Sequence, residues 1–210
     1  MRKILLVGGG KIGSAITDLL GATGDYALTV ADRDAASLAR LSAPNVSPKH
    51  IDIADERALS AAAAGHDMVV SAAPYTLTPV IARAAKDARA HYFDLTEDVE
   101  STRIVKVLAA GAESAFVPQC GLAPGYISIC AADIARRFDS LREVQMRVGA
   151  LPVFPTNALK YNLTWSTDGL INEYCNPCES IRDGELIEVP ALEELEAFSL
   201  DGVEYEAFNT

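Results

Sequence analysis

A short apolar run followed at once by a glycine-rich loop constrains the fold more than any other feature of the sequence. Residues 4–7 are all apolar, which is typical of a strand buried on both faces. Residues 8–13 read Gly-Gly-Gly-Lys-Ile-Gly and match the pattern G-x-G-x-x-G. Ile12, Ile16 and Leu19 then recur at the spacing of one helix face. A strand, a glycine loop and a helix in this order are typical of the first unit of a parallel sheet that binds a dinucleotide.

Each glycine of the loop has a physical role in that interpretation. Gly8 permits the tight turn, Gly10 lets a pyrophosphate approach the backbone, and Gly13 lets the helix pack closely on the strand. The helix start at Lys11 and Ile12 presents free N–H groups and a partial positive charge to the phosphates. The alternative is a glycine-rich turn without a ligand.

The end of the predicted second strand carries the residues that bear on cofactor choice. Asp32 lies 19 residues after Gly13, where an acid binds the adenosine ribose hydroxyls. A carboxylate there repels a 2′-phosphate, so Asp32 favours NAD over NADP. Arg33 leaves NADP open, because it can stack on adenine or pair with a 2′-phosphate if Asp32 turns away. Arg33 as a solvated loop charge is the other possibility.

Two further segments are expected to contact the cofactor. Asp52 and Ile53 end the predicted third strand, where a carboxylate lies near the adenine edge. Ala72, Ala73 and Pro74 follow the fourth strand, and small residues there leave space for the ribose and the nicotinamide. A plain loop acid and ordinary packing are the respective alternatives.

Short apolar runs alternate with helical patterns through the first 120 residues. This layout predicts an α/β fold, a Rossmann-type doubly wound parallel sheet. The expected strands are residues 4–7, 26–31, 49–53, 67–71, 91–94 and 114–117.

The pattern changes after Gly121. One more helical stripe follows, then Val144, Met146 and Val148 alternate with polar residues as in a half-exposed strand. Asp183-Gly184 has the form of a hairpin turn. We therefore expect an NAD(P)-binding Rossmann domain at residues 1–123 and part of an α+β substrate or dimerisation domain at 124–210.

Charge and composition exclude several partners. The formal net charge is −11, and residues 173–210 hold eleven acids and one base. An acidic chain without a basic patch is a poor candidate for nucleic acid or for anionic membrane surfaces. No apolar run reaches the roughly 18–20 residues of a membrane span. Without an export signal, we expect a cytoplasmic protein with reduced cysteines. The acidic segment is either a solvated face or balanced by a basic partner surface.

Cys175-Asn176-Pro177-Cys178 has the CxxC spacing of some metal and redox sites. It has no second Cys or His pair nearby, so four zinc ligands cannot be counted locally. A thioredoxin-like setting for a redox disulfide is also absent. We predict a loop around Pro177 and no metal site.

Five stretches give the chain a family resemblance. It resembles the saccharopine dehydrogenase-like family, particularly its lysine 6-dehydrogenase and saccharopine reductase branch. The matching stretches are residues 4–13, Ala31-Asp32-Arg33-Asp34, residues 69–75, Phe93-Asp94-Leu95-Thr96 and Gly121-Leu122-Ala123-Pro124-Gly125. The last is the most distinctive, because such a turn directly after the sixth strand is not a general Rossmann feature.

The resemblance implies an activity, a second domain and an oligomer. It implies NAD(P)-linked oxidation of an amine, or reduction of an imine, on an amino acid such as lysine or saccharopine. It also implies a substrate pocket in the second domain and, commonly, a homodimer. Members of the family are usually much longer, so the chain is expected to lack the C-terminal return to the nucleotide domain.

Candidate residues for the chemistry are less sharply defined. Asp94 ends the fifth strand, where it can hold the substrate ammonium or relay a proton, or cap the turn that follows. Tyr75 lies at the same edge and can pack on nicotinamide or bond to the substrate, or else be a surface residue at a helix start. Tyr161, Asn162 and Trp165 are candidates for lining the substrate pocket, with sheet packing as the alternative.

The leading hypothesis is an NAD(P)-dependent amino-acid dehydrogenase or imine reductase of the saccharopine dehydrogenase type. A cofactor-binding regulatory module, or an inactive fragment without turnover, is the competing interpretation. The resemblance also permits polyamine synthesis through carboxynorspermidine.

Overall fold

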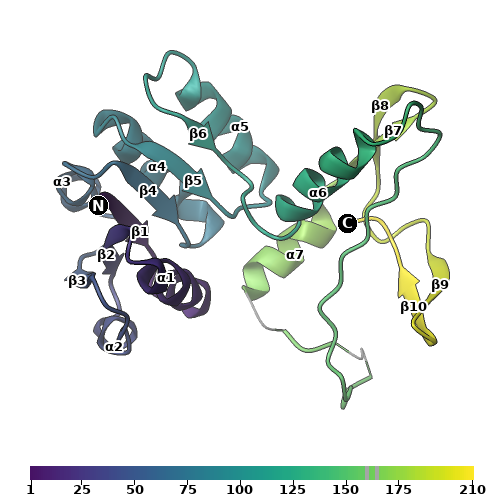
Figure 1. Ribbon diagram of the computed structural model, residues 1–210, viewed down its shortest axis with the longest axis horizontal. Coiled ribbons are helices and arrows are strands. Elements are labelled where there is room, and N and C mark those ends of the chain that lie inside the picture. The colour runs from purple at the N-terminus through teal and green to yellow at the C-terminus, as the bar shows by residue number, and fades with distance from the viewer. Residues whose placement is uncertain (159–160, 164–165) are drawn as a thin grey trace. The chain divides into compact units, whose positions relative to one another are not determined.

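The computed structural model describes residues 1–158, 161–163 and 166–210. The chain divides into two compact units, residues 1–139 and 140–210 (Figure 1). Residues 124–139, which the sequence analysis assigns to the second domain, belong to the first unit in this division. The boundary after residue 123 therefore stays a prediction.

The first unit is built on a six-stranded parallel sheet with the order β3-β2-β1-β4-β5-β6. From the central β1, strands β2 and β3 are added on one side and β4, β5 and β6 on the other. This is the doubly wound strand order expected of a dinucleotide-binding fold. The strands are β1 Arg2–Val7, β2 Tyr26–Asp32, β3 Val46–His50, β4 Met68–Ser71, β5 His91–Asp94 and β6 Phe116–Val117. The predicted fold class is confirmed.

Helices follow each strand, and several of them begin at an aspartate. Asp34 accepts bonds from the N–H groups at the start of α2, Asp55 does the same for α3, and Asp98 caps α5. Such caps satisfy N–H groups that have no partner inside the helix. The helices are α1 Lys11–Thr23, α2 Ala35–Ala39, α3 Glu56–Ala63, the 3₁₀ turn η1 Tyr75–Leu77, α4 Thr78–Asp87, α5 Val99–Ala109 and α6 Tyr126–Ala135.

Alternate residues of the central strand β1 enter two separate cores. Leu5 and Val7 pack with residues of α3, α4 and α5. Leu6 packs with residues of α1 and α2 on the opposite face. Figure 1 shows these two groups of helices on the two sides of the sheet. The expectation that residues 4–7 form a strand buried on both faces is therefore confirmed.

The third strand begins earlier than the sequence indicates. The prediction was residues 49–53, but β3 spans Val46–His50 and its register pairs Val30 with Pro48. Proline has no N–H to donate, which argues against a central strand, but β3 is the edge strand and needs partners on one side only. Ile53 instead lies beyond the strand, where it is buried in the core against α3 and α4.

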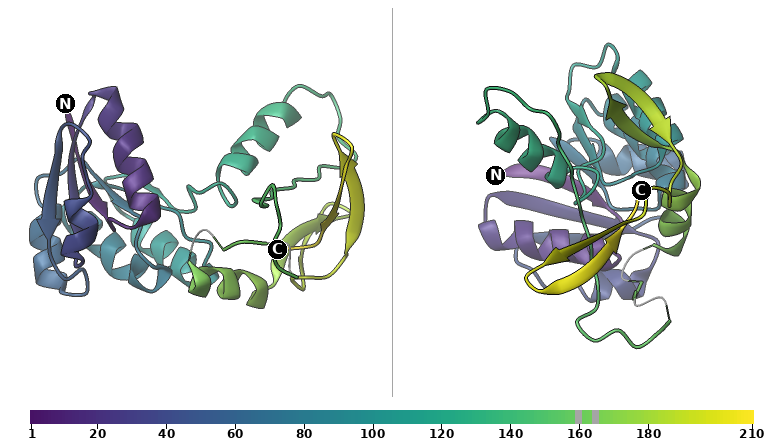
Figure 2. Two further views of the ribbon diagram at one scale, coloured as in Figure 1. Left: turned by 90° about the horizontal axis from the view of Figure 1, so that it is seen from below. Right: turned by 90° about the vertical axis from the view of Figure 1, so that its right-hand side faces the viewer.

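The described residues of the second unit form one helix and two hairpins, which can be followed in Figure 2. Helix α7 spans Thr167–Cys175, and strands β7 Cys178–Arg182 and β8 Glu185–Val189 pair as an antiparallel hairpin. Asp183 and Gly184 have positive φ values of 53° and 83°, as the predicted turn requires. Strands β9 Glu196–Leu200 and β10 Val203–Ala207 form a second hairpin through Asp201-Gly202, which the sequence analysis missed although the signal is the same.

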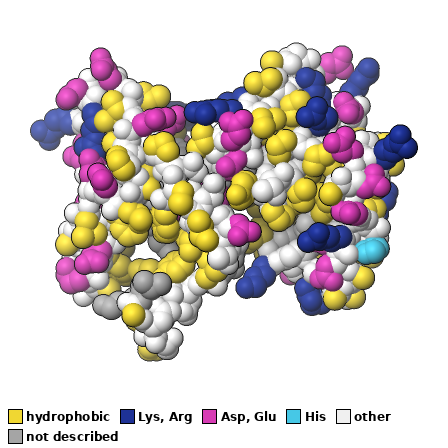
Figure 3. All heavy atoms as spheres, turned by 180° about the vertical axis from the view of Figure 1, so that it is seen from behind, with side chains coloured by type: hydrophobic (Ala, Val, Ile, Leu, Met, Phe, Trp, Pro, Cys, Tyr) yellow, Lys and Arg dark blue, Asp and Glu magenta, His cyan; other side chains and the backbone are white. Residues whose placement is uncertain are grey.

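The strand expected around Val144, Met146 and Val148 does not form. Residues 143–150 are irregular, and these three side chains are 54%, 53% and 46% exposed. A strand needs a hydrogen-bonding neighbour, and none of the described strands pairs with this segment. Hydrophobic side chains are likewise exposed over much of the face drawn in Figure 3.

Two acids of the C-terminal segment form ion pairs within the second unit. Arg147 donates to both oxygens of Glu196 at 2.5 and 2.9 Å and lies over the Phe198 ring. Arg182 pairs with Glu194. Part of the acidic segment is therefore balanced by arginines of the same unit. Within the described part of the chain, no helix combines the length and apolar character that crossing a membrane requires.

Candidate functional site

The glycine loop between β1 and α1 is shaped by two close backbone approaches. Gly8 has a φ of 104°, and a Cβ there would lie 2.7 Å from the carbonyl oxygen of Ala72. A Cβ on Gly13 would lie 1.9 Å from the carbonyl oxygen of Gly8. Both distances are far shorter than van der Waals contact, so only glycine fits at either position.

The same loop leaves an open cradle at the start of α1. A Cβ on Gly10 would meet nothing within 4 Å. Gly10 is the N-cap of α1 and offers no side chain to the free N–H groups, while the Ser14 N–H is already bonded to Gly10 at 2.8 Å. Lys11 and Ile12 are exposed. Free N–H groups beside open space suit a pyrophosphate, so these residues fit the phosphates of a dinucleotide.

Asp32 is fixed in place by two backbone N–H groups. Its Oδ2 accepts from Gly9 at 2.6 Å and its Oδ1 accepts from Asp34 at 2.8 Å. Each carboxylate oxygen retains a further lone pair, so ribose hydroxyls can still donate to it. The side chain is half-buried at the end of β2, directly beside the glycine loop.

Arg33 is exposed beside Asp32. Its carbonyl oxygen lies 2.9 Å from Nε2 of His50, the residue that pairs with Asp32 in the sheet. This bond fixes the backbone of Arg33 while the guanidinium stays in solvent. Asp52 is also exposed, and its Oδ1 accepts from the Ala54 N–H at 3.0 Å.

The side chain of Ile53 is only 5% exposed and packs in the core. Only its backbone is therefore in a position to face a ligand. Ala72 donates its N–H to the carbonyl oxygen of Val7 at 2.8 Å, which holds the end of β4 against the glycine loop. Ala73 is half-buried and Pro74 exposed, so small side chains line this stretch.

Asp94 occupies the predicted edge of the sheet but faces inward. Its side chain is 1% exposed, and its Oδ1 accepts from the N–H groups of Thr96 at 3.1 Å and Gln119 at 3.0 Å. Burial raises the pKa of this carboxyl, although the Gln119 N–H, the Tyr92 hydroxyl and the Thr96 N–H oppose the shift. The geometry makes Asp94 a residue that holds two backbone segments together.

Sequence reasoning missed the polar groups buried beside Asp94. Ser71 is its register partner on β4, and Tyr92 lies two residues earlier on the same face of β5. Within the described residues, the hydroxyls of Ser71 and Tyr92 and Oδ2 of Asp94 are buried without a well-formed hydrogen bond, although the Tyr92 hydroxyl lies close enough to Asp94 to lower its pKa. Burial and the nearby Asp94 carboxylate raise the pKa of Tyr92. The signal in the sequence is a polar residue at the end of each of two buried strands, Ser71 on β4 and Asp94 on β5.

The remaining candidates are Tyr75 in the first unit and three residues of the second unit. Tyr75 is half-buried at the start of η1, and its carbonyl oxygen accepts from Ser101 Oγ at 3.2 Å. In the second unit, Asn157 donates to the carbonyl oxygen of Tyr161 at 2.8 Å and to Oδ1 of Asn162 at 3.2 Å. Trp165 lies outside the described residues.

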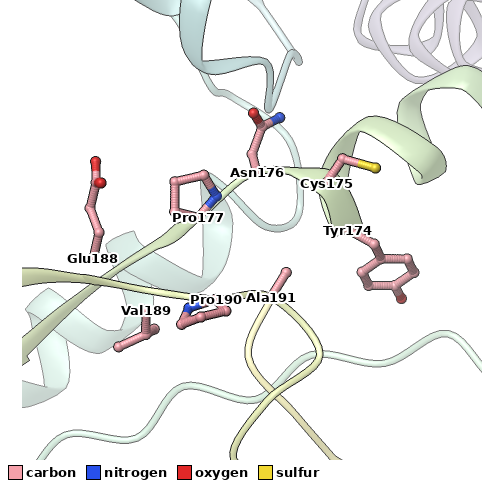
Figure 4. A pocket seen from close by; sticks show the side chains of 8 residues that line it. All are labelled: Tyr174, Cys175, Asn176, Pro177, Glu188, Val189, Pro190 and Ala191. Atoms are coloured by element: carbon pink, nitrogen blue, oxygen red, sulfur yellow. The ribbon is translucent and has the colours of Figure 1, made fainter.

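A shallow pocket of the second unit contains none of the predicted site residues. It is lined by residues 174–177 and 188–191, with Tyr174 and Cys175 at the end of α7 and Glu188 on β8 (Figure 4). Cys175 and Cys178 are both free thiols, and burial raises the pKa of Cys178. The described residues contain no group of three or more His, Cys, Asp or Glu arranged to hold a metal.

Comparison with known proteins relates both parts of the chain to one family. The model of the saccharopine dehydrogenase NADP binding domain matches residues 4–116, and that of the saccharopine dehydrogenase C-terminal domain matches residues 121–210. The chain is 27% identical over 203 residues to the saccharopine dehydrogenase [NADP(+), L-glutamate-forming] of Saccharomyces cerevisiae, covering 93% of this chain and 45% of that protein.

Two further matches agree with this. The mitochondrial alpha-aminoadipic semialdehyde synthase of Mus musculus is 22% identical over 199 residues, covering 90% of this chain and 21% of that protein. The solved apo structure of the L-Glu-forming saccharopine dehydrogenase from Saccharomyces cerevisiae superposes with a TM-score of 0.72 at 23% identity. That superposition covers 99% of this chain and 49% of the other. The chain thus spans about half the length of the yeast relative.

Substitutions at Gly13 and Gly10 should distinguish the loop's role in folding from its role in cofactor binding. Gly13→Ala should lower the free energy of unfolding by about 1–3 kcal/mol, because its methyl group would overlap the Gly8 carbonyl. Gly10→Ala should change it by less than about 1 kcal/mol, since the site is open and φ is −68°. It should still weaken NADH binding. Urea unfolding and NADH titration measure the two effects; equal destabilisation by both variants would contradict this account.

Asp94→Asn should change the pH dependence of stability. The folded state raises the pKa of Asp94 above its ordinary value of 3.8, so this carboxyl's contribution to stability is present below that pH and lost as pH rises through the folded pKa. The Asn variant lacks this loss. Its free energy of unfolding should therefore rise relative to that of the unchanged protein as pH increases from about 4 to 8. Urea unfolding across that range tests the slope, and a constant difference would refute it.

Proposed function

The chain belongs to the saccharopine dehydrogenase family, and from this premise we propose that it is a nicotinamide-dependent oxidoreductase acting on a carbon–nitrogen bond of an amino acid. Saccharopine and lysine are the candidate substrates. One observation carries the proposal: an open, uncapped glycine loop with a fixed acid beside it, in a chain matched along its length by two saccharopine dehydrogenase domains. The relative from yeast is named for the same reaction class.

The residues of the first unit divide the work of holding the cofactor. The loop at Gly10 receives the pyrophosphate on free N–H groups, and Asp32 accepts the ribose hydroxyls. Ala72 and Ala73 leave room for the nicotinamide half of the molecule at the end of β4. When bound, the nicotinamide supplies the position that accepts or donates a hydride. The protein orients the nicotinamide and, through the small side chains of Ala72 and Ala73, leaves space for it.

We assign NAD as the preferred cofactor, although the matched domain and the yeast relative are named for NADP. Asp32 cannot readily turn away, because Gly9 and Asp34 both donate to it. A fixed carboxylate at the ribose hydroxyls repels a 2′-phosphate. Arg33 lies in solvent beside it and gives NADP a weaker second route.

The proposal includes a small-molecule amino-acid substrate contacted by the second unit, with Tyr161 and Asn162 as candidates, and a cytoplasmic homodimer. The acidic net charge of −11 supports the exclusion of nucleic acid and anionic membrane as partners.

Turnover by the purified full chain tests the function. NAD or NADP is mixed with saccharopine, lysine or carboxynorspermidine, and the absorbance of the reduced nicotinamide is followed. NAD reduction with saccharopine or lysine supports the proposal, and reduction only with carboxynorspermidine supports a polyamine dehydrogenase. Cofactor binding without turnover of any of the three would contradict an enzyme and favour a regulatory module.

Cofactor choice should depend on the charge of Asp32. Asp32→Asn keeps an oxygen for the Gly9 N–H but removes the negative charge. The ratio of NADPH to NADH affinity should then rise about tenfold, because one repulsion with the 2′-phosphate is gone. Fluorescence titration with each reduced cofactor measures the ratio. Asp25→Asn, at the exposed residue directly before β2, is the matched control for loss of one charge and should leave the ratio unchanged.

A further inference from the structure

Two segments far apart in the sequence meet at Asp94. Its Oδ1 accepts from the N–H of Thr96, in the loop directly after β5, and from the N–H of Gln119, in the loop after β6. Its backbone carbonyl oxygen also accepts from the Cys120 N–H at 2.7 Å. Since the side chain is 1% exposed, water does not compete for these bonds. Asp94 therefore ties the end of β5 to the loop that follows β6.

The loop residue that Asp94 holds has an unfavourable backbone conformation. Gln119 has a φ of 60°, in the left-handed region that residues with a Cβ rarely adopt. Such a conformation persists where surrounding bonds over-determine it. Asp94 provides two of those bonds, one at the Gln119 N–H and one at the Cys120 N–H.

The held corner in turn supports the glycine turn at residues 121–125. A Cβ on Gly125 would lie 2.3 Å from the Gly121 carbonyl oxygen and 2.7 Å from that of Gln119. The Tyr126 N–H, at the start of α6, donates to the Gly121 carbonyl oxygen at 2.9 Å. With backbone packed this closely, a change in the conformation of Gln119 must displace the turn and the first residues of α6.

The turn lies at the ligand edge of the sheet. Val7 pairs with Ser71, and Ser71 pairs with Asp94, so the carboxyl ends of β1, β4 and β5 are level. The cofactor loop follows β1 and the glycine turn follows β6 at this same edge. Ligands of open parallel sheets bind outside the carboxyl ends of the strands.

We propose that Asp94 is a positioning residue that locks the turn at residues 119–125 in the conformation that receives the substrate, while cofactor binding does not depend on it. The inference rests on the proposed function for the identity of that ligand. It differs from a catalytic role, because the buried carboxylate acts through backbone N–H groups and does not itself touch substrate.

Two substitutions at Asp94 distinguish the loss of its hydrogen bonds to the loop from the loss of its charge alone. Asp94→Asn keeps an Oδ1 acceptor for Gln119 and Thr96, and its new amide group replaces the buried Oδ2 near the Tyr92 hydroxyl. Asp94→Ala removes the acceptor. If the Ala variant does not fold, Asp94→Ser replaces it. The serine hydroxyl is too short to reach the Thr96 and Gln119 N–H groups, so this variant also lacks the two bonds.

The readouts are the turn itself and the kinetics of the full chain. Cys120 is an exposed free thiol inside the corner, so its rate of alkylation by iodoacetamide, mapped by peptide mass spectrometry, reports on the turn. Burial and the Asp94 charge raise the pKa of the Cys120 thiol, so both variants lose that charge effect and the decisive comparison is between them. We expect alkylation to be about tenfold faster, and the KM for the amino acid about tenfold higher, in the Ala variant than in the Asn variant. The Kd for NADH should change less than about twofold in both.

A rescue and a control exclude a general loss of stability. Gln119→Gly should restore slow alkylation and low KM to the Ala variant, because glycine adopts positive φ without cost. Thr29→Val, which removes the bond between Thr29 and His66, weakens a partly buried contact elsewhere and should leave both readouts unchanged.

Three results would overturn the proposal: an Ala variant with unchanged Cys120 alkylation, an Asn variant as impaired as Ala, or impairment that Gln119→Gly fails to relieve. Absence of turnover in the unchanged protein would instead count against the proposed function. In that case alkylation alone decides whether Asp94 holds the turn.

Discussion

The close approach of α1 to the loop at Gly8 is the contact on which the first unit depends. A Cβ at Gly13 would lie 1.9 Å from the Gly8 carbonyl oxygen, so the helix reaches its position only because two side chains are missing. That position brings the helix start beside the end of β4, where Ala72 bonds to Val7. The central strand β1 can then bury Leu5 and Leu6 in opposite cores. The open glycine loop that suits a dinucleotide and the two-sided core therefore arise from one packing requirement.

Much of this unit could be predicted from the sequence, because its signals are local. In the first unit, the buried strand at residues 4–7 and the glycine loop each depend on a few neighbouring residues, as does the Asp183-Gly184 hairpin in the second unit. The error at β3 came from a non-local fact: Pro48 is acceptable only because that strand lies at the edge of the sheet. Sequence alone does not show which strand is an edge.

The candidate site shows the same limit. The spacing of Asp32 after Gly13 located an acid beside the glycine loop, since strand and helix lengths fix that distance. The spacing could not show that Asp94 is buried, because its partners Gln119 and Cys120 lie 25 and 26 residues away. In the second unit, the residues around Val144 alternate as a strand does, yet alternation does not supply the neighbour that a strand needs. The hydrophobic pattern predicts which face of a helix or strand is apolar, but it does not show which other element packs or pairs with it.

Asp32 and Asp94 use one physical device at two places on the same sheet edge. Each ends a strand, each accepts two backbone N–H bonds through its carboxylate, and each fastens a segment that adjoins a glycine turn. A carboxylate is suited to this because charge-assisted bonds to N–H groups are stronger than neutral ones. The two differ in exposure: Asp32 is half-buried and keeps lone pairs for a ligand, whereas Asp94 is closed off from solvent. The same side chain therefore stays open to a ligand where water reaches it, and bonds only to other parts of the protein where water does not.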